Sequence, residues 1–155
     1  MAFETWNEAR ADEIIAQHAT REGAVLPVLH AVQSAFGFVP EEAIPLVARA
    51  LNLSRADVHG VVTFYSDFCR EVPGRHVLKL CRGEACQSMG ANALADHTRA
   101  NLNVEWHQTT ADRRFTLDPV FCLGLCATAP SAMLDGKPVG RLDAARLDAL
   151  IEKAP

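Results

Sequence analysis

Four of the five cysteines in this 155-residue chain fall into two tight pairs, and no other feature constrains the fold as strongly. Cys81 and Cys86 have the spacing C-x4-C, whereas Cys122 and Cys126 have the spacing C-x3-C. Thiolate sulfur is a soft donor that selects soft or borderline metals. We therefore expect the 35 residues between the pairs to fold so that two distant loops meet around one metal site.

The spacing indicates a metal site, but it does not specify which metal the site holds. An iron–sulfur cluster is favoured, because each pair can hold one side of a small cluster. A structural zinc site with four thiolates stays open, although its pairs usually have the spacing C-x2-C. Ordinary buried or redox-active thiols are the third interpretation. Cys69 lies outside both pairs, and we interpret it as a small hydrophobic residue without a ligand role.

The composition excludes several classes of function. The hydrophobic fraction of 49% is typical of a globular protein, and a net charge of −4 without a basic stripe argues against nucleic-acid binding. The chain has neither a G-x-G-x-x-G motif nor a phosphate loop, so we do not expect it to bind NAD by itself. Its longest apolar run, residues 24–29, is too short to insert into a membrane, and no secretory signal is visible. We expect a cytoplasmic protein with reduced cysteines.

The first part of the chain has the pattern of a small helical bundle. Apolar residues recur at steps of three and four, as at Val25, Leu29, Val32 and Phe36, and thus mark one face of a helix. Ser54 and Asp57 have the spacing of a capping box that begins another helix. The expected helices cover residues 7–20, 24–36, 41–51 and 55–65.

The second part has the pattern of a sheet packed against helices. Pro73-Gly74 is a strong turn signal, so we place a domain boundary there and expect domains 1–72 and 73–155. Asp135-Gly136 is a signal for a type I′ hairpin turn, and Asp143 is a suitable cap for a last helix. The overall fold class is α+β. The expected strands are 76–80, 114–120, 131–134 and 137–140, with a helix over 87–102.

Both cysteine pairs follow expected strands, so their sulfurs should project from loops at one edge of the sheet. Gly83 and Gly124 allow these loops to curl and to turn N–H groups toward sulfur. We expect Cys86 at the start of the helix 87–102, where free N–H groups favour a thiolate. A [2Fe–2S] site with four thiolates is negatively charged, which predicts a low reduction potential, about −400 mV in comparable plant-type sites.

The residues around these cysteines carry a family resemblance. The stretches C-R-G-E-A-C-Q-S-M-G from Cys81 and C-L-G-L-C-A-T-A-P from Cys122, with V-H-G-V-V-T-F-Y from Val58, resemble the thioredoxin-like [2Fe–2S] ferredoxin family. The resemblance covers about residues 14–151. That family includes small iron–sulfur subunits of NADH:quinone oxidoreductases, of NAD-linked hydrogenases and of NAD-dependent formate dehydrogenases. The phrases A-L-N-L-S-R-A-D-V-H-G-V and R-G-E-A-C-Q-S are most similar to the formate dehydrogenase gamma subunit.

The resemblance implies an N-terminal helical bundle followed by a thioredoxin-like α/β domain that carries one [2Fe–2S] cluster. It carries the four ligand positions onto Cys81, Cys86, Cys122 and Cys126, and it assigns no ligand role to Cys69. The thioredoxin C-x-x-C motif is absent, so the likeness is one of architecture and does not imply dithiol chemistry.

The resemblance also implies a partner. It is a larger flavoprotein subunit that holds FMN and binds NAD(H), in a complex with a molybdenum-containing subunit that oxidises formate. This chain is then an electron-transfer subunit without catalytic residues of its own. A quinone oxidoreductase or a hydrogenase is the alternative host. A zinc-binding interaction module is the alternative from another class of protein.

Overall fold

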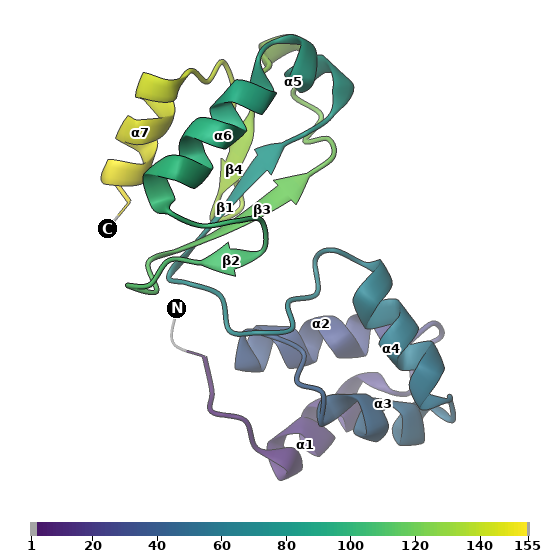
Figure 1. The fold of residues 1–155 in the computed structure, drawn as a ribbon. Coiled ribbons are helices and arrows are strands. Elements are labelled where there is room, and N and C mark those ends of the chain that lie inside the picture. The colour runs from purple at the N-terminus through teal and green to yellow at the C-terminus, as the bar shows by residue number, and fades with distance from the viewer. Residues whose placement is uncertain (1–2, 155) are drawn as a thin grey trace. The chain divides into compact units, whose positions relative to one another are not determined.

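The structure is a computed structural model in which residues 3–154 are described. The chain divides into two compact units, of which the first ends at Val72 and the second begins at Pro73. Helices make up the first unit, whereas the second contains a mixed sheet with helices against it (Figure 1). The α+β fold class expected from the sequence is therefore confirmed.

The first unit is a bundle whose helices follow the expected ranges closely. Leu29, Val32 and Phe36 are completely buried in its core, while Val25 at the start of the same apolar face is only partly buried. The ring of Trp6 packs edge-on against Phe36. The helices are α1 (Glu8–His18), α2 (Val25–Phe36), α3 (Ala43–Leu51) and α4 (Arg55–Phe64).

The ends of these helices are set by local chemistry. The side chain of Asn7 caps α1 by accepting a hydrogen bond from the N–H of Arg10. Gly37 ends α2 in the left-handed conformation with a φ of 84°, which a residue without a Cβ adopts at little cost. Helix α3 begins two residues later than expected, because Glu41 and Glu42 form a turn after Pro40.

The capping box of α4 is complete and gives a stability prediction. The Ser54 hydroxyl accepts a hydrogen bond from the N–H of Asp57 at 3.0 Å, and the Asp57 carboxylate accepts bonds from the hydroxyl and N–H of Ser54. Replacing Ser54 with alanine should lower the free energy of unfolding by about 0.5–2 kcal/mol at neutral pH. Urea unfolding followed by circular dichroism measures this loss.

The same box predicts a pH dependence. Hydrogen bonds from the Ser54 hydroxyl and then its N–H hold the pKa of the Asp57 carboxyl below its usual value. The stabilisation from this carboxylate is thus complete above the usual carboxyl range and is lost as the pH falls through the lowered pKa. The stability difference between wild type and Ser54→Ala should shrink in strong acid. A difference that stays constant from neutral to strongly acidic solution would contradict this account.

The second unit is built on a five-stranded sheet in which two strands run parallel. Strands β1 and β3 are parallel neighbours, and the other neighbouring pairs are antiparallel, in the order β2-β3-β1-β4-β5. The hairpin between β4 and β5 turns at Asp135 and Gly136, whose φ values of 48° and 79° fit the expected type I′ turn. The strands are β1 (His76–Cys81), β2 (Gln108–Thr109), β3 (Phe115–Val120), β4 (Ala132–Leu134) and β5 (Lys137–Val139).

Helices α6 (Ala91–Leu102) and α7 (Ala144–Glu152) lie beside one another against the sheet (Figure 1). Their apolar side chains form one core with alternate residues of the central strands. Asp143 caps α7 as expected, accepting a hydrogen bond from the N–H of Arg146. The core includes Leu78, Leu80, Leu94, Phe115, Leu117, Leu147 and Ile151.

The predicted bounds of one helix were wrong. Residues 87–102 do not form one helix, because the chain forms a short helix α5 (Glu84–Ser88), bends at Gly90 with a φ of 92°, and then begins α6. Cys86 is consequently the third residue of α5 and does not start a long helix. Strand β2 was not expected, since two residues are too few to show an alternating pattern. Within residues 3–154 no helix has the length and apolar character needed to cross a membrane.

Candidate metal centre

The parallel pairing of β1 and β3 brings the two cysteine loops together. Cys81 ends β1, and its partner in the register is Val120, which ends β3. The carboxyl ends of parallel strands lie at the same edge of a sheet. The N–H of Arg82 continues the pairing by donating to the carbonyl oxygen of Val120 at 2.7 Å. The loop to Cys86 and the loop to Cys122 therefore leave the sheet side by side.

Two glycines, Gly83 and Gly124, shape these loops, as expected from the sequence. A Cβ atom added at Gly83 would lie 3.0 Å from the carbonyl oxygen of Phe121 in the other loop, so a side chain there would push the loops apart. Gly124 has a φ of 74°, a conformation that favours glycine. Its N–H points at sulfur and donates to Cys122 Sγ at 3.3 Å.

The two pairs differ in exposure. Cys81 and Cys86 are buried, with 3% and 2% of their surfaces accessible, whereas Cys122 and Cys126 are exposed. The sulfurs of the exposed pair lie 3.8 Å apart. The buried pair packs with Ala91, which is also buried. Three side chains that are only partly buried pack against this cluster: Val120, Leu123 and Ala129. Within residues 3–154, no three or more His, Cys, Asp or Glu side chains form a group that is arranged to hold a metal ion.

Hydrogen-bond donors converge on the buried sulfur of Cys81. Burial on its own raises the pKa of this thiol, because it disfavours the charged form. Bonds from the N–H of Gly83, the side chain of Cys86, the N–H of Leu123 and the hydroxyl of Ser131 outweigh burial and bring the pKa below the usual value. The loops thus stabilise a thiolate at this position.

Crowding of like charges acts on the exposed pair. Cys122 raises the pKa of the Cys126 thiol through a hydrogen bond and through its charge, and burial and the charges of Cys86 and Cys81 act in the same direction. The charges of the other three cysteines therefore all act on Cys126, although two of these cysteines lie on the other loop. Thiolates that repel one another are a donor set that a soft cation neutralises. The four cysteines on adjoining loops therefore fit a metal–sulfur group by the chemistry of their sulfur donors, and not by a preformed coordination geometry.

The other metal-binding residue types lie elsewhere or are engaged. Cys69 belongs to the first unit, where its N–H donates to the side chain of Gln33 at 2.6 Å. His97 lies 2.9 Å from Asp148, and His76 lies 2.8 Å from Asp135. Each of these two histidines is therefore paired with a carboxylate.

Sequence reasoning missed one polar residue beside the sulfurs. Ser131 is 2% exposed, and its hydroxyl oxygen lies 3.5 Å from Cys86 Sγ. Its carbonyl oxygen accepts a hydrogen bond from the N–H of Cys81 at 3.0 Å. Ser131 belongs to neither cysteine motif, so no spacing pattern indicated it.

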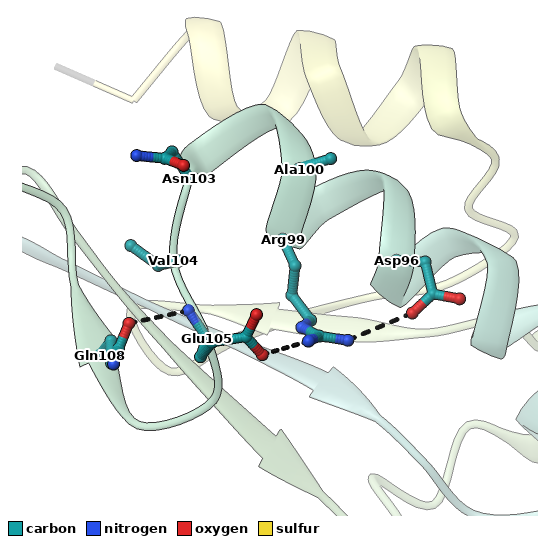
Figure 2. Close-up of a pocket in the computed structure, with 7 residues that line it drawn as sticks. All are labelled: Asp96, Arg99, Ala100, Asn103, Val104, Glu105 and Gln108. Carbon is teal, nitrogen blue, oxygen red and sulfur yellow. Dashed lines mark hydrogen bonds and ion pairs between the residues drawn. The ribbon is translucent and has the colours of Figure 1, made fainter.

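An open hollow of about 510 Å³ lies apart from the cysteines, at the end of α6 and the loop that follows it (Figure 2). Its charged groups are paired with one another. Arg99 Nη1 lies 3.3 Å from Asp96 Oδ1, and Arg99 also pairs with Glu105. The N–H of Glu105 donates to Gln108 at 3.0 Å. These pairs hold the end of α6 to the loop that leads to β2.

Comparison with known proteins identifies the chain's family. The family model described as thioredoxin-like [2Fe-2S] ferredoxin matches residues 11–155. The chain belongs to this family. Its cofactor is thus one [2Fe–2S] cluster, and the recognition made from the two cysteine motifs is confirmed. Ferredoxins transfer electrons through an iron–sulfur cluster, so the family supports the iron–sulfur interpretation of the cysteines over the zinc interpretation.

Named relatives come from two kinds of complex. The chain is 39% identical over 137 residues to an NADH-quinone oxidoreductase subunit of Rhizobium meliloti (strain 1021), covering 88% of this chain and 82% of that protein. It is 35% identical over 122 residues to the NADP-reducing hydrogenase subunit HndA of Solidesulfovibrio fructosivorans, covering 79% and 71%. Both relatives are subunits by name.

A solved structure has the same fold. The crystal structure of an NAD+-reducing [NiFe]-hydrogenase in the air-oxidized state matches 84% of this chain with a TM-score of 0.69 and 32% identity. This thioredoxin-like ferredoxin chain spans only 22% of the matched hydrogenase chain. The similarity therefore concerns one part of that larger protein.

Proposed function

We propose that Cys81, Cys86, Cys122 and Cys126 bind one [2Fe–2S] cluster in an electron-transfer subunit of an NAD-linked oxidoreductase. The observation that carries the proposal is the meeting of the two cysteine loops at the ends of β1 and β3. A bound cluster accepts and releases one electron at a time. The chain contributes the four thiolates, N–H donors to sulfur and a partly apolar cover.

The difference in exposure between the pairs supports electron exchange from one side. Cys81 and Cys86 are shielded from water, while Cys122 and Cys126 open to the surface next to Phe121, which is 73% exposed. An electron partner approaches most closely on that exposed side. We propose that the partner is a flavoprotein subunit that binds NADH and holds FMN, so that FMN and NAD are not bound by this chain.

The most specific part of the proposal is the host complex. We propose an NAD-dependent formate dehydrogenase, in which a molybdenum-containing subunit oxidises formate. The support is the phrase that begins at Ala50 and the phrase around Cys86, which are most similar to the gamma subunit of that enzyme. The relatives named above favour a second host, a quinone oxidoreductase or a hydrogenase.

Isolation of the native complex separates these hosts. A tagged copy of this chain, expressed in its own organism, should co-purify with a flavoprotein and a subunit that contains molybdenum. Mass spectrometry and metal analysis identify both. Recovery of the flavoprotein with membrane subunits, or with a nickel-containing subunit, would instead establish the second host.

The cluster itself gives a direct prediction. The full chain, purified without air, should be reddish-brown and contain about two irons and two acid-labile sulfides per chain. Its electron spin resonance signal should appear only after strong reduction, because the low potential resists reduction. A colourless protein with one tightly bound zinc would overturn the proposal and establish the zinc-binding interaction module.

Two further parts of the proposal concern organisation and location. We propose that the two compact units are domains, a helical bundle over 1–72 and a thioredoxin-like ferredoxin domain over 73–155. A cytoplasmic location is supported by the chemistry of the site, because cluster assembly needs cysteines that stay reduced. Limited proteolysis near Pro73, followed by mass spectrometry, tests the domain boundary.

A further inference from the structure

The buried hydroxyl of Ser131 lies beside the sulfurs of the buried cysteine pair. Its oxygen is 3.5 Å from Cys86 Sγ. The carbonyl oxygen of the same residue accepts the N–H of Cys81 at 3.0 Å. Ser131 is thus held next to the buried pair by its backbone, which bonds Cys81, and by its side chain, which lies against the sulfur of Cys86.

The direction of these hydrogen bonds follows from chemistry. In the absence of a metal, either the thiol or the hydroxyl can donate between Cys86 and Ser131. A cysteine that ligates iron has lost its proton, so its sulfur only accepts. The hydroxyl must then be the donor. Ser131 is 2% exposed, so water does not compete at this position.

We propose that Ser131 is a positioning residue that donates its hydroxyl hydrogen to the thiolate of Cys86 and thereby raises the reduction potential of the cluster. Reduction adds one negative charge to the cluster and its sulfurs. A hydrogen bond donated to sulfur stabilises the more negative form more strongly, which is one way in which a protein sets the potential. This inference rests on the ligand assignment in the proposed function.

The test is a redox titration of the full-length protein with its cluster, followed by electron spin resonance. Ser131→Ala should reduce the equilibrium constant for one-electron reduction roughly tenfold, a decrease of about 59 mV in potential. Ser88→Ala is the matched control. Ser88 lies in α5 near Cys86, but its hydroxyl donates to the carbonyl oxygen of Ala85 at 2.9 Å. The control should keep the wild-type potential.

A second variant covers the case in which Ser131→Ala loses the cluster. Ser131→Thr keeps the hydroxyl while changing the volume, so it should keep both the cluster and a potential near that of wild type. An unchanged potential in Ser131→Ala overturns the inference, as does loss of the cluster in both variants. Absence of a [2Fe–2S] cluster from wild type would instead refute the proposed function, so the two failures are distinguishable.

Discussion

Replacing Cys122 with alanine is expected to abolish the [2Fe–2S] cluster or to degrade its visible and electron spin resonance spectra. Cys122 is exposed, its sulfur lies 3.8 Å from that of Cys126, and it accepts a hydrogen bond from the N–H of Gly124. Its removal leaves three thiolates for a cluster that needs four ligands. Iron and sulfide per chain, measured after anaerobic purification, should fall far below those of wild type.

Cys69→Ala is the matched control, because it removes the one cysteine of the other unit. Its iron content and spectra should equal those of wild type. A folded Cys69→Ala protein without its cluster would refute the ligand assignment. Retention of a normal spectrum by Cys122→Ala would refute it equally. Circular dichroism on both variants shows whether the fold is preserved.

Replacing Phe115 with alanine should lower the free energy of unfolding by about 3–5 kcal/mol, the range for a buried phenylalanine. Phe115 lies on β3 with 1% of its surface exposed, in the core shared by the sheet, α6 and α7. Since a typical domain is stable by about 5–15 kcal/mol, this loss is a large fraction of the total. Urea unfolding of the cluster-free protein, followed by circular dichroism, measures it.

Phe121→Ala makes the same chemical change six residues later and serves as the control. Phe121 is 73% exposed, so its replacement should change stability by no more than about 0.5 kcal/mol. If Phe115→Ala lost as little stability as Phe121→Ala, the buried ring of Phe115 would contribute less to stability than its burial implies. Both substitutions remove the same ring, so the contrast reports on the burial of Phe115 and on its contacts with His76 and Arg114.

Much of the fold was predictable because its signals are local. The predicted caps at Ser54 and Asp143 and the predicted turn at Asp135-Gly136 act through contacts between residues no more than three positions apart. Apolar periodicity located α2 for the same reason, since it also acts between residues three and four positions apart. The break at Gly90 was missed, because the buried apolar residues that mark the helix, Ala91, Leu94 and Ala95, all lie after the break and do not indicate where the helix begins.

The candidate site was predictable in its residues and only partly in its environment. Cys81, Cys86, Cys122 and Cys126 are apparent from their spacing, and their place after two strands follows from the alternating pattern. Ser131 was not apparent. Its contact with Cys86 joins residues 45 positions apart, and such a contact exists only after β4 pairs with β1.

The cysteine spacings and the residues around them were enough to propose the four ligands and the loops that carry them, and to recognise the family, which the family model confirms. The difference between the buried pair, Cys81 and Cys86, and the exposed pair, Cys122 and Cys126, became apparent only in the folded protein. The reason is physical. Spacing along the chain specifies which sulfur atoms are available to a metal. The burial and hydrogen bonding of these atoms depend on which distant segments pack around them, and those segments meet only when the strands pair.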